Sequence, residues 1–257
     1  MSSPSTIARE LTVSRERSGL NRSQLAKLAG VPASTISRIE KGDVQPSTEM
    51  LNRVLAPLGR AASITPTSTP EASAAARAAC DPSYPGDLDR TAQDLLGSWG
   101  RIGLIEGSIA ALGKDRDVLY QASRLDSVAA RQGAVRFAPR RDWIAAAEAL
   151  ERVSGLAWAL TGGAAANTMV NVGGDEPQVF YVSDVALALD AGRLAALPSN
   201  APGIRAWLVP FNGIWELGAR TLSDGLNVAD RFQIAVDCLS LGGAGPTQAE
   251  ALLGAWV

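Results

Sequence analysis

The spacing of apolar residues over the first sixty positions predicts a bundle of short helices. Ile7, Leu11 and Val13 give a first helix its apolar face. Asn21 then precedes a second helical stretch, and Gln24 follows three residues later. A helix-capping residue followed at this distance by Gln or Glu is typical of a capping box, so a second helix is expected to begin after Asn21.

A tight turn and a third helix follow the second one. Gly30 lacks a Cβ atom and suits the left-handed conformation that ends many helices. The third helix is expected over residues 33–41, with Ile36 and Ile39 facing the core. A fourth helix, capped at its start by a serine, is expected over residues 47–58.

Beyond residue 60 the pattern changes twice. Residues 61–86 contain four prolines and no apolar periodicity, which predicts a flexible linker. From residue 87 onward, apolar runs of β-type composition alternate with helical stretches rich in Ala and Leu. Strands are predicted at 156–160, 178–183 and 205–211. These patterns predict a multidomain protein: an all-α bundle, a linker and an α/β (α+β) C-terminal domain.

Composition excludes several kinds of chemistry. The 257 residues include no histidine, which removes imidazole bases, Ser-His and Cys-His nucleophile pairs and histidine metal sites. The two cysteines cannot form a four-thiolate zinc site or a disulfide framework. No stretch resembles a signal peptide or a membrane span, so a cytoplasmic protein that does not bind membranes is expected. We expect neither a bound metal nor a cofactor.

The overall net charge of -2 conceals an uneven distribution along the chain. The first sixty residues carry nine basic and five acidic side chains, a net charge of +4, and the rest of the chain therefore carries -6. A basic segment joined to an acidic body is typical of proteins that bind nucleic acid at one end.

The basic segment also resembles a known family. Its stretch GLNRSQLAKLAGVPASTISRIEKGDVQPSTEMLNRVLAPLG is similar to XRE/Cro-type repressor DNA-binding domains. The likeness covers about fifty-five residues, and the residues that carry it are Ala26 at a packing position, Gly30 in the turn and the run STISRIEKG. It implies a helix-turn-helix fold that binds double-stranded DNA.

The resemblance also implies which residues contact DNA. It places the helix that begins near Ala33 in the major groove, with Arg38 as the strongest specificity contact, because arginine pairs well with guanine O6 and N7. A single small domain buries limited surface, so a homodimer on an inverted-repeat operator is expected. The predicted DNA-binding residues are Arg22, Ala33, Ser34, Thr35, Ser37, Arg38, Lys41, Gln45 and Asn52.

A second candidate site is the turn formed by Thr161, Gly162 and Gly163, between a predicted strand and a helix. Helix starts of this kind favour anions, and nucleotidyltransferase folds share the arrangement. Their chemistry needs Ser or Thr after the glycines and two carboxylates on the next strand. Ala164 follows the glycines here, and the strand 178–183 has no carboxylate. We therefore expect a protein that is not an enzyme. The glycines then indicate either an inactive relative of these enzymes or tight packing of the helix on the strand.

The C-terminal region resembles a second family. Segments 156–166, 184–197 and 224–253 are similar to the C-terminal domain of AbiEi-type antitoxins, the regulators of type IV toxin–antitoxin systems. Such proteins repress their own operon and counter a nucleotidyltransferase toxin, either by direct contact or only functionally. The usual DNA-binding module of that family is a winged helix. This chain departs from that pattern, because its N-terminal region resembles an XRE/Cro-type domain.

The resemblances set the predicted domains. They are a helix-turn-helix domain at 1–60, the linker at 61–86 and an AbiEi-like domain at 87–257. Residues 87–138 have two interpretations: a degenerate winged-helix segment, because Gly133–Pro139 has the composition of a wing strand, or an extension of the C-terminal domain.

The predicted function is an autorepressing antitoxin in a prokaryotic cytoplasm, associated with the nucleoid when bound to its operator. Two alternatives stay open. The first is a repressor that responds to a small ligand and has no toxin. The second is an inactive nucleotidyltransferase-like domain on a DNA-binding module.

Overall fold

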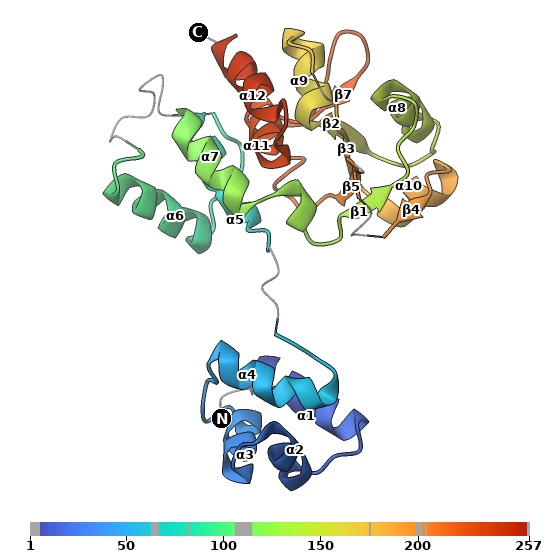
Figure 1. Cartoon of the computed structure of the whole chain (residues 1–257). Coiled ribbons are helices and arrows are strands. Elements are labelled where there is room, and N and C mark those ends of the chain that lie inside the picture. The colour runs from blue at the N-terminus through green and yellow to red at the C-terminus, as the bar shows by residue number, and fades with distance from the viewer. Residues whose placement is uncertain are drawn as a thin grey trace. The chain divides into compact units, whose positions relative to one another are not determined.

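The chain divides between residues 65 and 66 into an N-terminal and a C-terminal unit. The computed structural model describes residues 6–62, 67–81, 83–105, 115–174, 176–198, 202–203 and 205–255. The first unit is helical and the second combines helices with a sheet, as the predicted multidomain fold class requires (Figure 1). None of the helices in the described ranges is long and apolar enough to cross a membrane.

The N-terminal unit is a bundle of short helices around a small apolar core. Its core residues are Leu11, Leu25, Ala26, Ala29, Ile36, Ile39 and Val54. The elements are α1 (Thr6–Arg17), α2 (Arg22–Ala29), α3 (Ala33–Lys41), α4 (Thr48–Leu55) and the 3₁₀ helix η1 (Ala56–Leu58).

The predicted helix boundaries of this unit are confirmed by its caps. Asn21 Oδ1 accepts a hydrogen bond from the Gln24 amide at 2.9 Å, and the Asn21 amide donates back to Gln24 Oε1 at 2.8 Å. Gly30 ends α2 with φ 66°, a left-handed conformation that favours glycine. The predicted apolar face of α1 is partly wrong, because Ile7 is exposed and Ala8 is buried in its place.

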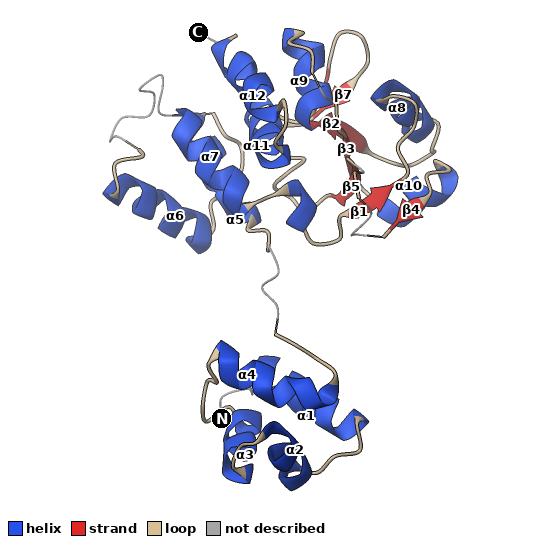
Figure 2. Ribbon diagram, in the orientation of Figure 1, coloured by secondary structure: helices blue, strands red, loops and turns tan. Residues whose placement is uncertain are grey.

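The C-terminal unit contains a mixed sheet of seven strands in the order β4-β1-β5-β3-β2-β7-β6 (Figure 2). The pairs β3–β5 and β2–β7 are parallel and the others are antiparallel. The three predicted strands are confirmed as β2, β3 and β5. The bounds are β1 (Val135–Phe137), β2 (Trp158–Thr161), β3 (Gln178–Val182), β4 (Ala196–Leu197), β5 (Ala206–Pro210), β6 (Arg220–Thr221) and β7 (Asn227–Val228).

Helices pack around this sheet and against one another. The helix α11 contacts α5, α7, α9 and α12 and is central to this packing. The Ala- and Leu-rich stretch 184–197 predicts one helix, but the helix observed there ends at Ala191 and residues 196–197 form β4. The helices are α5 (Pro70–Cys80), α6 (Arg90–Arg101), α7 (Asp115–Leu125), η2 (Val128–Ala130), α8 (Trp143–Glu151), α9 (Gly162–Val170), α10 (Val185–Ala191), α11 (Arg231–Leu241) and α12 (Gly245–Gly254).

The prediction of a flexible linker over residues 61–86 is wrong for its central part. Residues 70–80 form α5, which packs against α6, α7 and α11 and is buried along most of its length. Pro70 stands at the start of the helix, where the missing N–H costs nothing. Alanine favours helices and allows close packing, but it gives little hydrophobic periodicity. Residues 63–66 and 82 of the predicted linker lie outside the described residues.

The winged-helix interpretation of residues 87–138 is also wrong for the part that the structure describes. The strand β1, which lies inside the expected wing, pairs with β5 on one side and β4 on the other. It is therefore an internal strand of the C-terminal sheet, and the segment extends that unit. Residues 106–114 of the segment lie outside the described residues.

Candidate nucleic-acid interface

One face of α3 presents polar and basic side chains to solvent. Ser34, Arg38 and Lys41 are exposed at the spacing i, i+4 and i+7, so they lie in one row along the helix. The opposite face is buried through Ile36 and Ile39, which fixes the orientation of this row. In the described residues no hydrogen bond or ion pair engages the Arg38 side chain.

The neighbouring predicted contacts on α3 are less accessible. Ala33, the first helical residue, is exposed, whereas Thr35 and Ser37 are half-buried. The turn before α3 is held by main-chain hydrogen bonds, from Val31 N to Ala26 O at 3.0 Å and from Thr35 N to Pro32 O at 2.9 Å. A turn fixed in this way holds α3 at one angle to α2.

The remaining predicted DNA-binding residues differ in their surroundings. Lys41, the last residue of α3, and Gln45, in the loop that follows, are both exposed. Asn52 is half-buried on α4, and its Oδ1 accepts a hydrogen bond from the Ala62 amide at 2.7 Å. The side chain of Asn52 therefore holds the main chain at Ala62, near the end of the N-terminal unit.

A cluster of three charged side chains connects α1, α2 and α3. Glu40 accepts from Arg15 Nε through Oε1 and from Arg22 Nε through Oε2, both at 2.6 Å. Arg15 also donates to Leu20 O at 2.9 Å. The Glu40 side chain is 1% exposed and the Arg22 side chain is 49% exposed. We call these residues the Glu40 cluster.

The Glu40 cluster carries a net positive charge at neutral pH. Burial acts to raise the pKa of Glu40, but hydrogen bonds from Arg15 and Arg22 and the charges of both arginines outweigh it, so the pKa is lowered. The hydrogen bond to Glu40 raises the pKa of Arg15 against the effect of burial. Glu40 and Arg15 are therefore ionised, and the second guanidinium of the cluster, on the half-exposed Arg22, faces outward.

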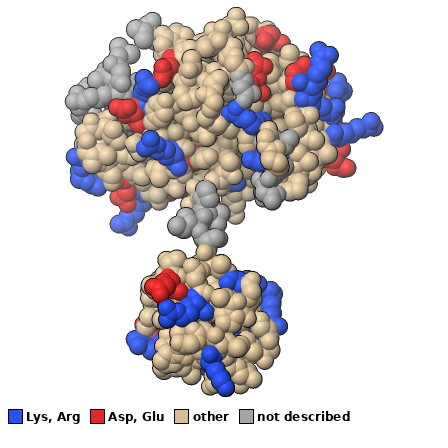
Figure 3. Space-filling model, viewed as in Figure 1, with Lys and Arg blue, Asp and Glu red and all other residues tan. Residues whose placement is uncertain are grey.

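An open depression lies beside this cluster at the start of α2. It has a volume of about 500 Å³ and is lined by Arg15, Glu16, Asn21, Arg22 and Ser23. The Arg22 guanidinium and the first amides of α2 are both suited to a phosphate group. Figure 3 shows basic side chains around the visible face of the unit and acidic ones mainly at one corner.

The Glu40 cluster was not predicted from the sequence. A basic residue such as Arg15 is expected on a solvated helix face, yet the residue is 8% exposed. One signal was available, because Arg15 follows the buried Leu11 by four residues and so lies on the inward face of α1. The partner residue Glu40 is twenty-five positions away, and no local pattern indicates that pairing.

The turn Thr161–Gly163 is buried inside the C-terminal unit. Thr161 is fully buried, and its hydroxyl donates to Asp237 Oδ2 at 2.5 Å. Gly162 has φ 67°, and a Cβ added there would lie 3.0 Å from Leu241 Cδ1. Both glycines are buried at the start of α9. Tight packing is therefore the use of this turn that the contacts support.

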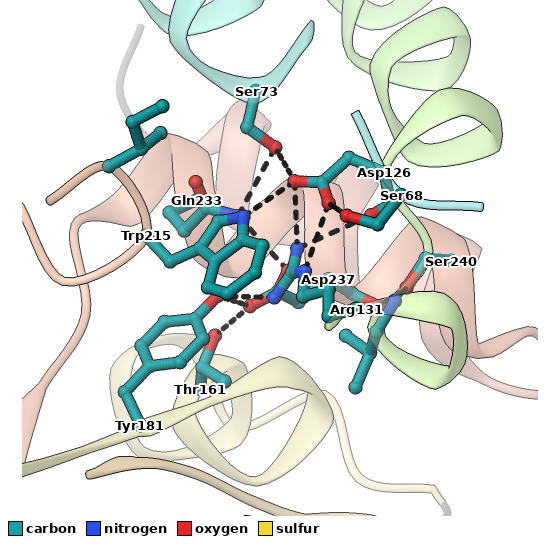
Figure 4. Close-up of polar contacts among 12 residues, drawn as sticks. Ser68, Ser73, Asp126, Arg131, Thr161, Tyr181, Trp215, Gln233, Asp237 and Ser240 are labelled. Carbon is teal, nitrogen blue, oxygen red and sulfur yellow. Dashed lines mark hydrogen bonds and ion pairs between the residues drawn. The ribbon is translucent and has the colours of Figure 1, made fainter. Parts of the chain in front are cut away.

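Asp237 belongs to a second group of three charged side chains, which we call the Arg131 cluster. Arg131 donates to Asp126 Oδ1 at 3.1 Å and to Asp237 Oδ1 at 2.6 Å, and all three side chains are fully buried. The aromatic rings of Tyr181 and Trp215 stack on each other beside the guanidinium (Figure 4). Tyr181 lies on β3 and Asp237 on α11, whereas Asp126, Arg131 and Trp215 lie in loops.

Hydroxyl, indole and amide groups complete the hydrogen bonding of the two carboxylates. Asp126 accepts from Trp215 Nε1 at 2.8 Å, and Asp237 accepts from the Tyr181 hydroxyl. The other donors are the hydroxyls of Ser68, Ser73 and Thr161 and the side-chain amide of Gln233.

The charges of the Arg131 cluster are fixed by their mutual contacts. Burial acts to raise the pKa of Asp126, but the charge of Arg131 and hydrogen bonds from serines outweigh it, and the pKa is lowered. Burial acts to lower the pKa of Arg131, but the charge of Asp237 and other contacts raise it. Burial raises the pKa of Tyr181 well above its usual value. The tyrosine therefore stays neutral, and its hydroxyl donates a hydrogen bond to Asp237.

Within the described ranges no group of three or more Cys, Asp or Glu side chains is arranged to hold a metal. Glu176 accepts a hydrogen bond from the side chain of Asn167, in the second half of α9, at 3.0 Å. Asp230 caps α11, because its Oδ1 accepts a hydrogen bond from the Phe232 amide at 3.0 Å.

Comparisons with known proteins concern the N-terminal unit. Residues 6–63 match a family described as a helix-turn-helix domain. Over 60 residues the chain is 45% identical to a Haemophilus influenzae protein named as an uncharacterized HTH-type transcriptional regulator. That match covers 23% of this chain and 61% of the relative, which is less than two thirds of its length. No solved structure matches the chain significantly. The N-terminal unit is a helix-turn-helix domain.

Proposed function

We propose that the protein is a sequence-specific DNA-binding transcriptional regulator. The observation that carries this proposal is the exposed row Ser34, Arg38 and Lys41 on α3, the second helix of the helix-turn-helix. In such domains this helix enters the major groove and its first turns contact base edges. The relative's name, HTH-type transcriptional regulator, supports the same function.

The proposed mode of binding assigns two kinds of contact. Arg38 reaches guanine O6 and N7, while Ser34 and Thr35 contact neighbouring base edges from the start of α3. Arg22, Lys41 and Gln45 contact phosphates and set the position of the domain on the duplex. Arg22 is suited to this role because Glu40 holds one edge of its guanidinium and the side chain is still half exposed.

In vitro selection from random duplexes with the full-length protein tests this function. We expect enrichment of a motif, and for a homodimer two half-sites whose centres are about 10–10.5 base pairs apart or a multiple of that spacing. The selected duplex and a scrambled version are then compared by fluorescence anisotropy. Absence of any enriched motif, together with equal affinity for both duplexes, contradicts the proposal.

We further propose that the regulator is an autorepressing antitoxin that counters a nucleotidyltransferase toxin. This finer proposal depends on the resemblance of segments 156–166, 184–197 and 224–253 to AbiEi-type proteins. In the structure the first segment contains β2 and the start of α9, and the second contains α10 and β4. The third contains β7, α11 and most of α12, and all three segments lie within the C-terminal unit. The proposed role is one of binding and regulation, without catalysis by this chain.

Co-expression tests the antitoxin role. A nucleotidyltransferase encoded beside this protein should arrest growth when expressed alone, and co-expression of the full chain should restore it. The Arg38→Ala variant is a useful comparison, because it should lose operator repression and retain the rescue if rescue depends on the C-terminal unit. Failure of the unmodified chain to restore growth contradicts the antitoxin role and leaves the DNA-binding proposal intact.

A further inference from the structure

The C-terminal unit has a surface pocket whose lining is not used by the DNA-binding proposal. Its volume is about 430 Å³, within the range of small-ligand sites. Apolar groups of Leu156, Trp158 and Phe211 line part of it. Polar and charged side chains line the rest: Glu151, Glu216, Arg220, Thr221 and Asn227.

The pocket lies at the end of the sheet where two parallel strands finish. Phe211 follows β5, and its amide donates to Val182 O at the end of β3 with a distance of 2.9 Å. Trp158, at the start of β2, stands opposite Val182 in the antiparallel pair. Crevices at the carboxyl ends of parallel strands are frequent ligand sites in α/β proteins.

One wall of the pocket is held rigidly from behind. It consists of residues of the loop 211–219. Arg77, on α5, donates hydrogen bonds to two carbonyl oxygens of this loop, Ile214 O at 2.8 Å and Leu217 O at 2.6 Å. Trp215 of the same loop is anchored in the Arg131 cluster. Glu216 accepts hydrogen bonds from the Asn212 and Gly213 amides at 3.1 and 2.7 Å, which fixes the turn. A preformed wall lowers the entropic cost of binding.

The charges in the pocket select the chemistry of its ligand. Two carboxylates and one guanidinium give the lining a net charge of -1, which disfavours phosphate-rich ligands such as nucleotides. Glu151 binds the Trp158 indole N–H at 2.9 Å through Oε2, which leaves Oε1 of the carboxylate for another donor. Arg220 is exposed and makes no ion pair with any residue that the structure describes.

We propose that this pocket binds an apolar α-amino acid of about the size of phenylalanine in its zwitterionic form. The ligand carboxylate pairs with Arg220, the ammonium group pairs with Glu151 and Glu216, and the side chain packs against Phe211 and the edge of Trp158. Binding of this kind goes beyond DNA recognition and supplies a ligand class for the regulator.

Isothermal titration calorimetry of the full-length protein tests the proposal with three matched probes. These are L-phenylalanine, 3-phenylpropanoate, which lacks the amine, and phenethylamine, which lacks the carboxylate. We expect saturable binding of L-phenylalanine, at least about tenfold tighter than binding of either analogue, because each analogue loses one charged contact.

Variants assign the two charges of the ligand to the pocket. Arg220→Gln should weaken L-phenylalanine about tenfold and leave phenethylamine unchanged. Glu151→Gln keeps an acceptor for the Trp158 indole and should weaken both L-phenylalanine and phenethylamine. Arg90→Gln, at a side chain 95% exposed on α6, is the control and should change nothing.

Three results would overturn the proposal. The first is no saturable binding of L-phenylalanine to the folded protein. The second is equal affinity for L-phenylalanine and either analogue. The third is binding that neither the Arg220 nor the Glu151 variant alters. Because calorimetry is done without DNA, these outcomes do not depend on whether the DNA-binding proposal holds.

Discussion

The Glu40 cluster and the Arg131 cluster are built from the same groups in opposite proportions. The first has one carboxylate between two guanidiniums, and the second has one guanidinium between two carboxylates. Their burial differs as well, because Arg22 in the first is half exposed whereas every charged side chain in the second is sealed from solvent.

The comparison separates a charge that is available to a partner from charges that only hold the fold. In the Glu40 cluster the carboxylate orients Arg22 while solvent still reaches the guanidinium, so it can bind a phosphate. In the Arg131 cluster every charge is surrounded by donors and acceptors of the same chain, which makes its removal costly. Shifted pKa values therefore mark a fully buried structural network in one unit and a cluster with a half-exposed arginine in the other.

Removal of Arg131 should have the largest effect on stability. Arg131→Met leaves two buried carboxylates without their counterion and should destabilise the C-terminal unit by about 3–5 kcal/mol. Arg124→Met, at an exposed arginine on α7, is the control and should change stability by no more than about 0.5 kcal/mol. Hydrogen exchange resolved by peptide measures each unit separately. Unchanged protection of α11 in the Arg131 variant would show that the cluster is not essential to the fold.

Replacement of Glu40 should have a smaller effect, confined to the N-terminal unit. Glu40→Gln keeps the shape but loses the charge that both arginines contact, and it should cost about 1.5–3 kcal/mol. Glu16→Gln removes the more exposed partner of Arg15 and should be nearly neutral. Faster exchange in α1–α3 with unchanged exchange in α11 is the expected result. Equal effects of the two variants would contradict the central position of Glu40.

The lowered pKa of Glu40 predicts how the N-terminal unit responds to acid. A carboxyl with a lower pKa in the folded state stabilises fully above its unfolded pKa, about 4.3, and loses that contribution as the pH falls through its folded pKa. Protection of α1–α3 should therefore decline below about pH 4.3 in the unmodified chain. Glu40→Gln should flatten this decline. An identical pH profile for both proteins would show that other carboxylates determine the acid response.

The smallest expected effect is the loss of DNA affinity when Arg22 is replaced. Arg22→Gln should weaken binding of the selected duplex and of a scrambled one equally, and it should reduce the slope of log K against log salt by about 1. Arg101→Gln removes the same charge from the C-terminal unit and is the control. A change in sequence preference without a change in salt slope would place Arg22 at a base instead of a phosphate.

Local features of the sequence predicted the N-terminal unit well. The capping pair Asn21 and Gln24, the left-handed Gly30 and the bounds of α3 are set by residues close together in the chain, and each is present in the structure. The strands β2, β3 and β5 were also predictable, because buried strands are continuous apolar runs. The DNA-contact roles of the predicted residues remain a prediction.

The features that were missed depend on distant residues or on weak patterns. Arg131 and Asp237 are 106 positions apart, and nothing near either one indicates the other. The helix α5 lacks the large apolar side chains that make periodicity visible, and the four prolines within residues 61–86 suggested a linker. The pocket beside Trp158 combines residues from α8, β2, β6, β7 and the loop after β5, so only the folded chain brings them together.

The most direct test of the account is the sequence preference of the Arg38→Ala variant. Anisotropy titrations of the unmodified chain and the variant, each with the selected duplex and its scrambled version, give two specificity ratios. We predict that the variant loses about 1–3 kcal/mol of discrimination and retains nonspecific binding, whereas Lys27→Ala on α2 keeps the ratio. An unchanged ratio in the Arg38 variant would contradict the claim that the exposed face of α3 reads the DNA sequence.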